Sequence, residues 1–230
     1  MLYEWSRAQP DIFIDIRHAG GIAMSFPDYV RSFDNEWWRV TLLGEPTMLV
    51  PVSLVVALWL WRSCGARVLL AWAGLLALAG LILIVQKLLF YVGGFAFDSI
   101  RLYTMSGHSV AAPFVYGSLA AMIAKHWRPG PRWTLYVLAA ALAIAIAISR
   151  VAVAHHRPSE AISGFAVGVL LLAAFLRWSW PWAKPTLAAW TLALPVLATI
   201  LLTYGHVIEF ENIFRWLGRR ARPGAGFHHP

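Results

Sequence analysis

A polar stretch, SRVAVAHHRPSE at residues 149–160, follows a long apolar run and holds two arginines, two histidines and a glutamate. A neutral imidazole can attack phosphorus, and it does so better when its other nitrogen donates to a carboxylate. Glu160 stands four residues after His156, close enough to be that carboxylate. We therefore predict phosphoryl-transfer chemistry, with His156 as the nucleophile and Glu160 as its orienting partner.

A second stretch, residues 87–110, ends in Ser-Gly-His at the start of another apolar run. Ser106 is a typical N-cap residue, and the unpaired N–H groups at the positive end of a helix form an anion site. Pro158 suits the first position of the following helix, which places His156 at a second helix start. His108 is the histidine available to protonate the leaving oxygen.

These two stretches resemble the second and third signature motifs of the type 2 phosphatidic acid phosphatase family: SGH at 106–108 and SR-x5-H-x3-E at 149–160. The resemblance covers roughly residues 87–175. It implies a helical-bundle core and hydrolysis of phosphate monoesters or pyrophosphates through a phosphohistidine, without metal; membrane members act on lipid phosphates. It also implies roles for particular residues: His156 as nucleophile, His108 as general acid, Glu160 as orienting carboxylate, and Ser106, Gly107 and Arg150 as phosphate contacts.

The sequence departs from the family pattern in its first motif. Lys87 is present, but Gly94 and Phe95 stand where the family has Arg-Pro. Arg101 is a candidate replacement for the missing arginine. Met105 precedes Ser106 in place of the usual proline, and Glu160 replaces the usual Asp. These changes indicate a divergent subgroup. Lys87 has a second interpretation, as a residue at a span end that extends to the membrane surface.

Composition places these motifs in a membrane protein. Apolar residues make up 60% of the chain and charged residues 13%, against roughly 45–50% and about 25% in soluble domains. Six apolar runs approach the roughly 20 residues that cross a bilayer as a helix, at 46–61, 68–86, 109–124, 133–149, 161–176 and 185–205. We predict an all-α fold, a polytopic bundle of about six transmembrane helices. The N-terminus lacks the pattern of a signal peptide.

The connections between the runs are of two kinds. The turns at 62–67, 125–132 and 177–184 carry seven Lys or Arg and no acid. The connections at 87–108 and 150–160 lie on the opposite membrane face, because successive spans alternate in direction. Basic residues of these connections suit a multiply charged anion: Lys87, Arg101, Arg150 and Arg157. The excess of basic residues in the plain turns predicts a bacterial-type inner (cytoplasmic) membrane protein whose site is on the outer, periplasmic face.

The chain divides into a polar leader at 1–45, a membrane phosphatase domain of six helices at 46–205 and a basic tail at 206–230. We expect part of the leader to be an interfacial helix anchored by Trp37 and Trp38, or else an ordered cap without membrane contact. The net charge of +8 is spread over short loops and tails, which argues against a nucleic-acid partner. We expect lipids as partners, and no obligatory protein partner is evident.

Three functions fit the motifs: a phosphatase acting on a lipid phosphate or a polyprenyl or lipid diphosphate, a lipid phosphotransferase using the same phosphohistidine, and a non-catalytic anion-binding membrane protein. We favour the phosphatase and expect no cofactor. A zinc site formed by His108, His155, His156 and Glu160 is the alternative reading of the histidines. It is disfavoured because adjacent histidines rarely point at one ion and the surrounding cations oppose metal binding.

Overall fold

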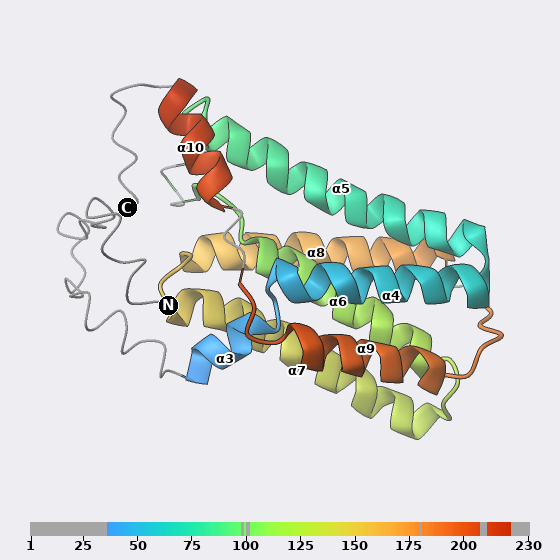
Figure 1. Ribbon diagram of the computed structural model, residues 1–230. Coiled ribbons are helices and arrows are strands. Elements are labelled where there is room, and N and C mark those ends of the chain that lie inside the picture. Colours follow the sequence, from blue (N-terminus) through green and yellow to red (C-terminus); the bar gives the residue numbers. More distant parts are fainter. Residues whose placement is uncertain (1–35, 98, 100–101, 180, 208–210, 222–230) are drawn as a thin grey trace.

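The fold is taken from a computed structural model and is described for residues 36–97, 99, 102–179, 181–207 and 211–221. In these residues the regular elements are helices, arranged lengthwise in a bundle (Figure 1). The helices are α3 (Glu36–Leu42), α4 (Pro46–Cys64), α5 (Ala66–Tyr91), α6 (Gly107–Ala124), α7 (Pro129–Ala152), α8 (Pro158–Ser179), α9 (Trp190–Thr203) and α10 (Glu211–Ala221). An isolated antiparallel bridge pairs Phe97 with Leu102. The predicted all-α fold class is confirmed.

Within the described residues, five helical segments are long and apolar enough to cross a membrane: 36–64, α5, α6, α7 and α8. The sixth predicted span contains α9, which has 14 residues and is therefore only about 21 Å long. Its helix starts later than the apolar run because the chain before it follows an extended path. There the backbone N–H of Thr186 donates to the carbonyl of Ser63 over 3.1 Å, and Pro185 has no N–H to contribute to a helix.

The core of the bundle is formed around α6, which packs mainly on α7 and α8. Aromatic side chains fill the space between α5, α6 and α8. The rings of Trp72 and Phe114 stack with centroids 5.7 Å apart, and Phe175 meets Phe114 edge to face. The indole N–H of Trp72 donates to the hydroxyl of Ser118 over 2.9 Å. The polar end of this buried ring is therefore satisfied, as burial requires.

Two glycines bring α6 and α8 unusually close at the end where the motifs lie. A Cβ on Gly168 would be 2.2 Å from the carbonyl oxygen of Val110, and one on Gly164 would be 2.8 Å from that of Ser106. Glycines four residues apart lie on one face of a helix and allow two backbones to approach. This contact sets the start of α6 beside the first turns of α8.

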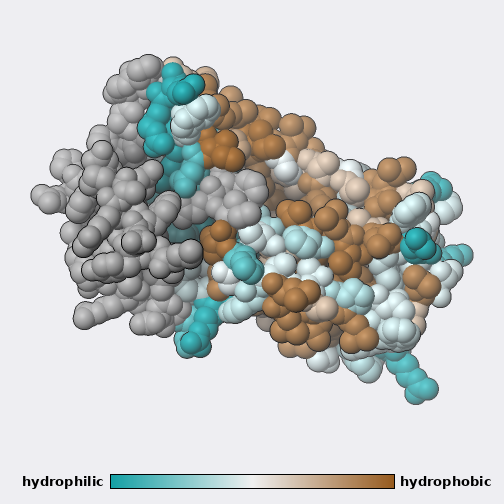
Figure 2. Space-filling view, in the orientation of Figure 1, coloured by the Kyte–Doolittle hydropathy of each residue, from teal (hydrophilic) through white to brown (hydrophobic). Residues whose placement is uncertain are grey.

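The outer surface of the bundle is apolar along its length. Figure 2 shows brown, hydrophobic atoms over α5 and α9, and leucines on these helices are strongly exposed, among them Leu70, Leu81, Leu201 and Leu202. An exposed apolar surface of this extent is expected for lipid contact and not for water. Together with the apolar helices it supports the membrane class predicted from the composition.

The end of the bundle that carries the motifs also carries α3 and α10. The helix α10 packs against the end of α5, and α3 packs against α7 (Figure 1). Trp38, on α3, was expected either to anchor the leader among lipid headgroups or to belong to an ordered cap without membrane contact. It is 8% exposed, and its ring meets that of His155 edge-on with centroids 5.1 Å apart. The division of the chain into leader, membrane domain and tail stays a prediction, and most of the leader and part of the tail lie outside the described residues.

Candidate active site

The predicted nucleophile and its carboxylate are in direct contact. His156 Nδ1 lies 2.8 Å from Glu160 Oε2, and both side chains are largely buried. The carboxylate also accepts from the backbone N–H groups of Thr104, over 3.0 Å, and Arg157, over 3.2 Å. Because Glu160 is in the first turn of α8 and is held by two backbone donors, it fixes the imidazole ring. The nitrogen left for attack on phosphorus is Nε2.

Glu160 also joins the two motif-bearing connections, which were expected to meet on one face. The backbone N–H of Ser106 donates to the carbonyl of Glu160 over 3.2 Å. Ser106 is the N-cap of α6, as predicted, and its hydroxyl accepts from the N–H of Ser109. The helix begins at Gly107, so the unpaired N–H groups of its first turn lie beside the His156–Glu160 pair.

The second predicted catalytic histidine has a carboxylate partner of its own. His108 Nε2 lies 3.0 Å from Glu45 Oε1, and the exposed fractions of the two side chains are 11% and 8%. Glu45 immediately precedes Pro46, the first residue of α4. A Cβ on the neighbouring Gly44 would be 2.8 Å from His108 Cδ2. Only glycine therefore lets the chain pass so close to the His108 ring.

Arg150 is buried in the last turn of α7 and is only partly satisfied. Its Nη1 atom donates to the hydroxyl of Thr41 over 2.9 Å and lies 4.0 Å from Glu45 Oε1. Its Nε atom is buried and has no hydrogen-bond partner. A buried donor left unpaired costs about 1–3 kcal/mol. The Arg150 Nε atom is therefore a donor suited to an oxygen atom of a bound anion.

Lys87 points into the protein and not toward the membrane surface. It is 9% exposed, and its Nζ atom lies 2.7 Å from Glu211 Oε2. The hydroxyl of Tyr91 donates to the other oxygen of the same carboxylate over 2.5 Å. The interpretation of Lys87 as a residue that extends to the lipid interface is thus not supported by its burial.

The other basic residues of the two connections lie in different settings. The guanidinium of Arg157 covers the ring of Tyr103, 5.0 Å from its centroid. His155 is exposed and packs against Trp38. Arg101, the predicted replacement for the missing arginine, lies outside the described residues. Its part in the site stays a prediction.

Comparison with known proteins now identifies the central part of the chain. Residues 84–184 match the PAP2 superfamily. The match includes both histidine motifs and Lys87, and it confirms the family resemblance drawn from them. An undecaprenyl-diphosphatase of Bacillus subtilis, BcrC, is 26% identical over 61% of this chain and 73% of its own. An uncharacterized 22.5 kDa protein in the cps region of Klebsiella pneumoniae is 25% identical over 61% of this chain and 68% of its own. No solved structure matches the chain.

The electrostatic setting of the PAP2 motifs suits a neutral nucleophile. Burial lowers the pKa of the His156 imidazole below its usual value of 6.5, and the Arg150 guanidinium lowers it further, against the opposing effect of the hydrogen bond to Glu160. The ring is therefore unprotonated at neutral pH. Burial alone would raise the pKa of the Glu211 carboxyl, but the ammonium of Lys87 and the two hydrogen bonds hold it well below its usual range.

Three residues in contact with the predicted site were missed from the sequence: Thr41, Glu45 and Glu211. Glu45 and Glu211 lie outside the segment that matches the PAP2 superfamily. One signal for Glu45 was available, since it directly precedes the first apolar run and therefore falls on the motif-bearing face. Glu211 gave a similar signal, because it follows the sixth run and returns to that face.

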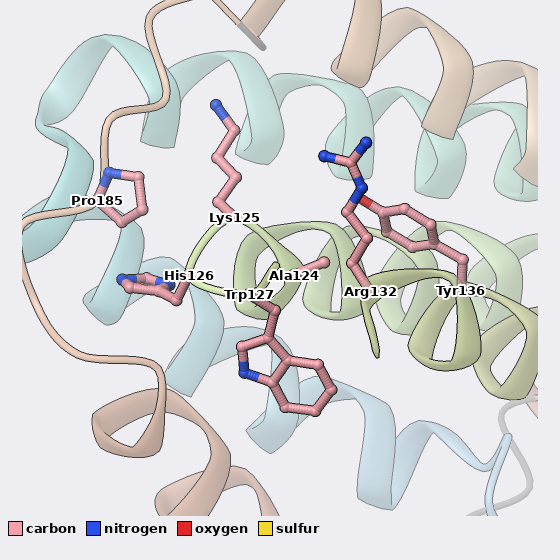
Figure 3. Close-up of a pocket in the computed structure, with 7 residues that line it drawn as sticks. All are labelled: Ala124, Lys125, His126, Trp127, Arg132, Tyr136 and Pro185. Carbon is pink, nitrogen blue, oxygen red and sulfur yellow. The ribbon is translucent and has the colours of Figure 1, made fainter. Parts of the chain in front are cut away.

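A cavity of about 310 Å³ lies at the opposite end of α6 and is separate from the PAP2 motifs. Its lining includes Lys125, His126 and Arg132 (Figure 3). The Lys125 ammonium donates to the carbonyl of Ala183, and His126 Nε2 lies 2.8 Å from the carbonyl of Leu187. These contacts tie the turn after α6 to the chain between α8 and α9. The cavity belongs to the basic face of the molecule.

Proposed function

We propose that this protein is a membrane phosphatase that hydrolyses a lipid phosphate or a polyprenyl or lipid diphosphate through a phosphohistidine intermediate. The observation that carries the proposal is the position of the His156–Glu160 pair, next to the start of α6. A neutral, oriented imidazole and an anion site meet there. The match of residues 84–184 to the PAP2 superfamily also supports a phosphatase.

In the proposed first step, His156 Nε2 attacks the phosphorus atom and forms a P–N bond. The P–O bond to the lipid alcohol, or to the second phosphate of a diphosphate, breaks, and His108 supplies the proton that the departing oxygen needs. In the second step, water attacks the same phosphorus and gives its proton to His108. The P–N bond breaks, inorganic phosphate is released, and both histidines return to their starting states.

The remaining residues stabilise charge on the transferred phosphoryl group. Arg150 offers its unpartnered Nε. The backbone N–H groups of Gly107 and His108 belong to the first turn of α6, where N–H groups have no partner within the helix. Preorganised donors of this kind supply much of the rate acceleration of an enzyme when water is excluded. Lys87 is a further phosphate ligand in this proposal, together with Ser106 and the predicted Arg101.

The substrate class follows from the position of the site. The motifs lie at the end of a bundle of apolar helices, where an amphiphile can place its phosphate while its chains stay in lipid. The relative named as an undecaprenyl-diphosphatase supports a lipid diphosphate among the candidates. The basic turns at the opposite end support an inner-membrane location with the site on the periplasmic face.

A substrate panel in detergent micelles tests the proposal. The panel contains phosphatidic acid, phosphatidylglycerol phosphate, a polyprenyl diphosphate and a lipid A phosphate, and the assay includes a strong chelator because the mechanism uses no metal. We expect phosphate release from one of these lipids by the natural protein and none by the His156→Ala variant. Release from short soluble esters alone would reject the lipid assignment. Transfer to a second lipid without phosphate release would reject hydrolysis.

A further inference from the structure

Glu211 forms an ion pair with Lys87, the predicted phosphate ligand. We propose that Glu211 is a specificity-determining residue that keeps singly charged phosphodiesters out of the site and is displaced by phosphate groups carrying two or more negative charges. The inference rests on the proposed function and deepens it, because it concerns which phosphate groups the same site accepts.

The Glu211 carboxylate takes up two donors in this part of the site, Lys87 and Tyr91. Both of its oxygens are engaged, one by the Lys87 ammonium at 2.7 Å and the other by the Tyr91 hydroxyl at 2.5 Å. Charge-assisted hydrogen bonds of this length are the strong ones in proteins. The two donors are held on successive turns of α5, four residues apart. A phosphoryl group could use the same donors only by taking the place of the carboxylate.

Glu211 is fixed to the site by its own helix. It is the first residue of α10, and α10 packs on α5. The ring of Phe214, one turn further along α10, lies 5.9 Å from Lys87 Nζ. The carboxylate is thus supplied by a packed element and not by a freely moving tail. Its partial exposure, 26% of the side chain, leaves room for it to turn outward when an anion enters.

The charge of the carboxylate decides which anions can enter. Glu211 is ionised at neutral pH, since Lys87 and the hydrogen bonds hold the pKa of its carboxyl below the usual range. An incoming anion meets its repulsion and must compete for Lys87. A phosphodiester brings one negative charge, whereas a phosphomonoester or diphosphate brings about two or more at neutral pH. The doubly charged group gains more from Lys87 and Arg150 and is the better competitor.

Exclusion of phosphodiesters matters for a protein that lies in a bilayer. Phosphodiester lipids are the bulk of the surroundings of a membrane protein, so a cationic site at the headgroup level is exposed to them at high concentration. A site with uncovered Lys87 and Arg150 would bind them without turning them over. A carboxylate on Lys87 reduces this unproductive binding, which is specificity by repulsion of the wrong partner.

The test measures anion binding and does not depend on catalysis. Full-length protein in neutral detergent at pH 8 is titrated with inorganic phosphate, a dianion, and with diethyl phosphate, a monoanion, and binding is read from the shift in thermal unfolding. We expect the natural protein to prefer inorganic phosphate. In Glu211→Gln, diethyl phosphate should bind roughly threefold to tenfold more tightly, the effect of one partly screened charge, and inorganic phosphate should bind at least as tightly as it does to the natural protein. Tyr91→Phe, which loosens the carboxylate without removing its charge, should tighten the binding of diethyl phosphate to a smaller extent.

Glu36→Gln is the matched control, because Glu36 pairs with Arg39 on the exposed surface of α3; it should leave the binding of both anions unchanged. Introducing Lys87→Gln should remove the effect of Glu211→Gln. Unchanged binding of diethyl phosphate in Glu211→Gln, or weaker binding of inorganic phosphate, would mean that Glu211 only supports Lys87 and would overturn the proposal. Lipid hydrolysis with no Glu211-dependent change in the binding of diethyl phosphate would reject this inference alone. Tighter binding of diethyl phosphate in Glu211→Gln without lipid hydrolysis by the natural protein would reject the proposed function alone. A natural protein that neither hydrolyses lipid phosphates nor binds inorganic phosphate would reject both.

Discussion

His108 and Glu45 form a buried pair, Nε2 to Oε1, over 3.0 Å although 63 residues separate them in the chain. The pair repeats the arrangement of His156 with Glu160, so each histidine of the candidate site has a carboxylate on one ring nitrogen. His156 and Glu160 are four residues apart in the chain, whereas His108 is in the first turn of α6 and Glu45 is the residue before α4. The segment before α4 is thereby part of the site, although it lies outside the residues that match the PAP2 superfamily.

The first prediction concerns this pair. Glu45→Gln removes the charge that holds the His108 ring while it keeps the size of the side chain. We expect kcat for a lipid phosphate to fall by about 10- to 100-fold, because an oriented proton donor contributes on that scale or above. The binding of inorganic phosphate should change much less. A variant with natural kcat would show that Glu45 does not act through His108.

The second prediction separates the two adjacent histidines. His156→Ala removes the side chain held by Glu160, and we expect phosphate release to fall by at least about 10³-fold. His155→Ala removes a ring that lies against Trp38 and should be much milder. Thermal unfolding of both variants checks that the fold survives. An inactive 155 variant beside an active 156 variant would reverse the assignment.

The third prediction is a pH dependence. His156 attacks only when its ring is unprotonated, and its pKa is lowered from 6.5 chiefly by burial. Activity should therefore persist as the pH falls below 6.5 and be lost only as it passes through the lowered pKa. The hydrogen bond to Glu160 raises this pKa, so Glu160→Gln should move the acidic limb of kcat/KM to still lower pH. The natural protein and the Glu160→Gln variant act on the same substrate. Ionisation of the substrate therefore affects both pH profiles equally and does not cause the difference between them. A limb displaced to higher pH would contradict the proposed pairing.

The candidate site was predictable where its chemistry is local in the sequence. Glu160 stands one helical turn from His156, so their spacing predicted the pair. Ser106 and the residues after it predicted the N-cap of α6. Glu45 and Glu211 could not be found in that way. Each meets its partner across 63 or 124 residues, and apolar runs give the number of helices but not their rotation or neighbours.

The membrane helices were also predicted from the sequence, but α9 is shorter than the apolar run at 185–205 that predicted it. Hydropathy predicted a span at 185–205 because it registers how apolar a run is. It does not register that the backbone of Thr186 pairs with Ser63, which delays the start of α9 to Trp190. The packing of α6 on α8 could not be predicted either. Gly164 and Gly168 indicate a close helix contact only when the helix that faces them is known.

The fourth prediction tests that packing. A Cβ on Gly168 would lie 2.2 Å from the carbonyl oxygen of Val110, so Gly168→Ala must push α6 and α8 apart. We expect a loss of about 1–3 kcal/mol in the free energy of unfolding, the usual cost of overpacking, and a lower Tm in detergent. Gly74→Ala is the control, since a Cβ there meets nothing within 4 Å. Equal Tm values for the two variants would show that the close contact does not contribute to stability.

The last prediction concerns orientation in the membrane. The turns at the end of the bundle opposite the motifs carry seven Lys or Arg and no acid, and short basic turns stay in the cytoplasm. The turn after α6, at Arg128, should therefore be cytoplasmic, and Ala221, at the end of α10, should be on the outer side with the site. Three basic residues of α10 favour the opposite orientation: Arg215, Arg219 and Arg220. Basic residues at the two ends of the bundle therefore favour opposite orientations in the membrane. Reporter fusions that distinguish cytoplasm from periplasm, placed after each of these residues, decide between them. An outer signal at Arg128 with a cytoplasmic signal at Ala221 would put the site on the cytoplasmic face, where its substrate would have to be presented from the inner leaflet.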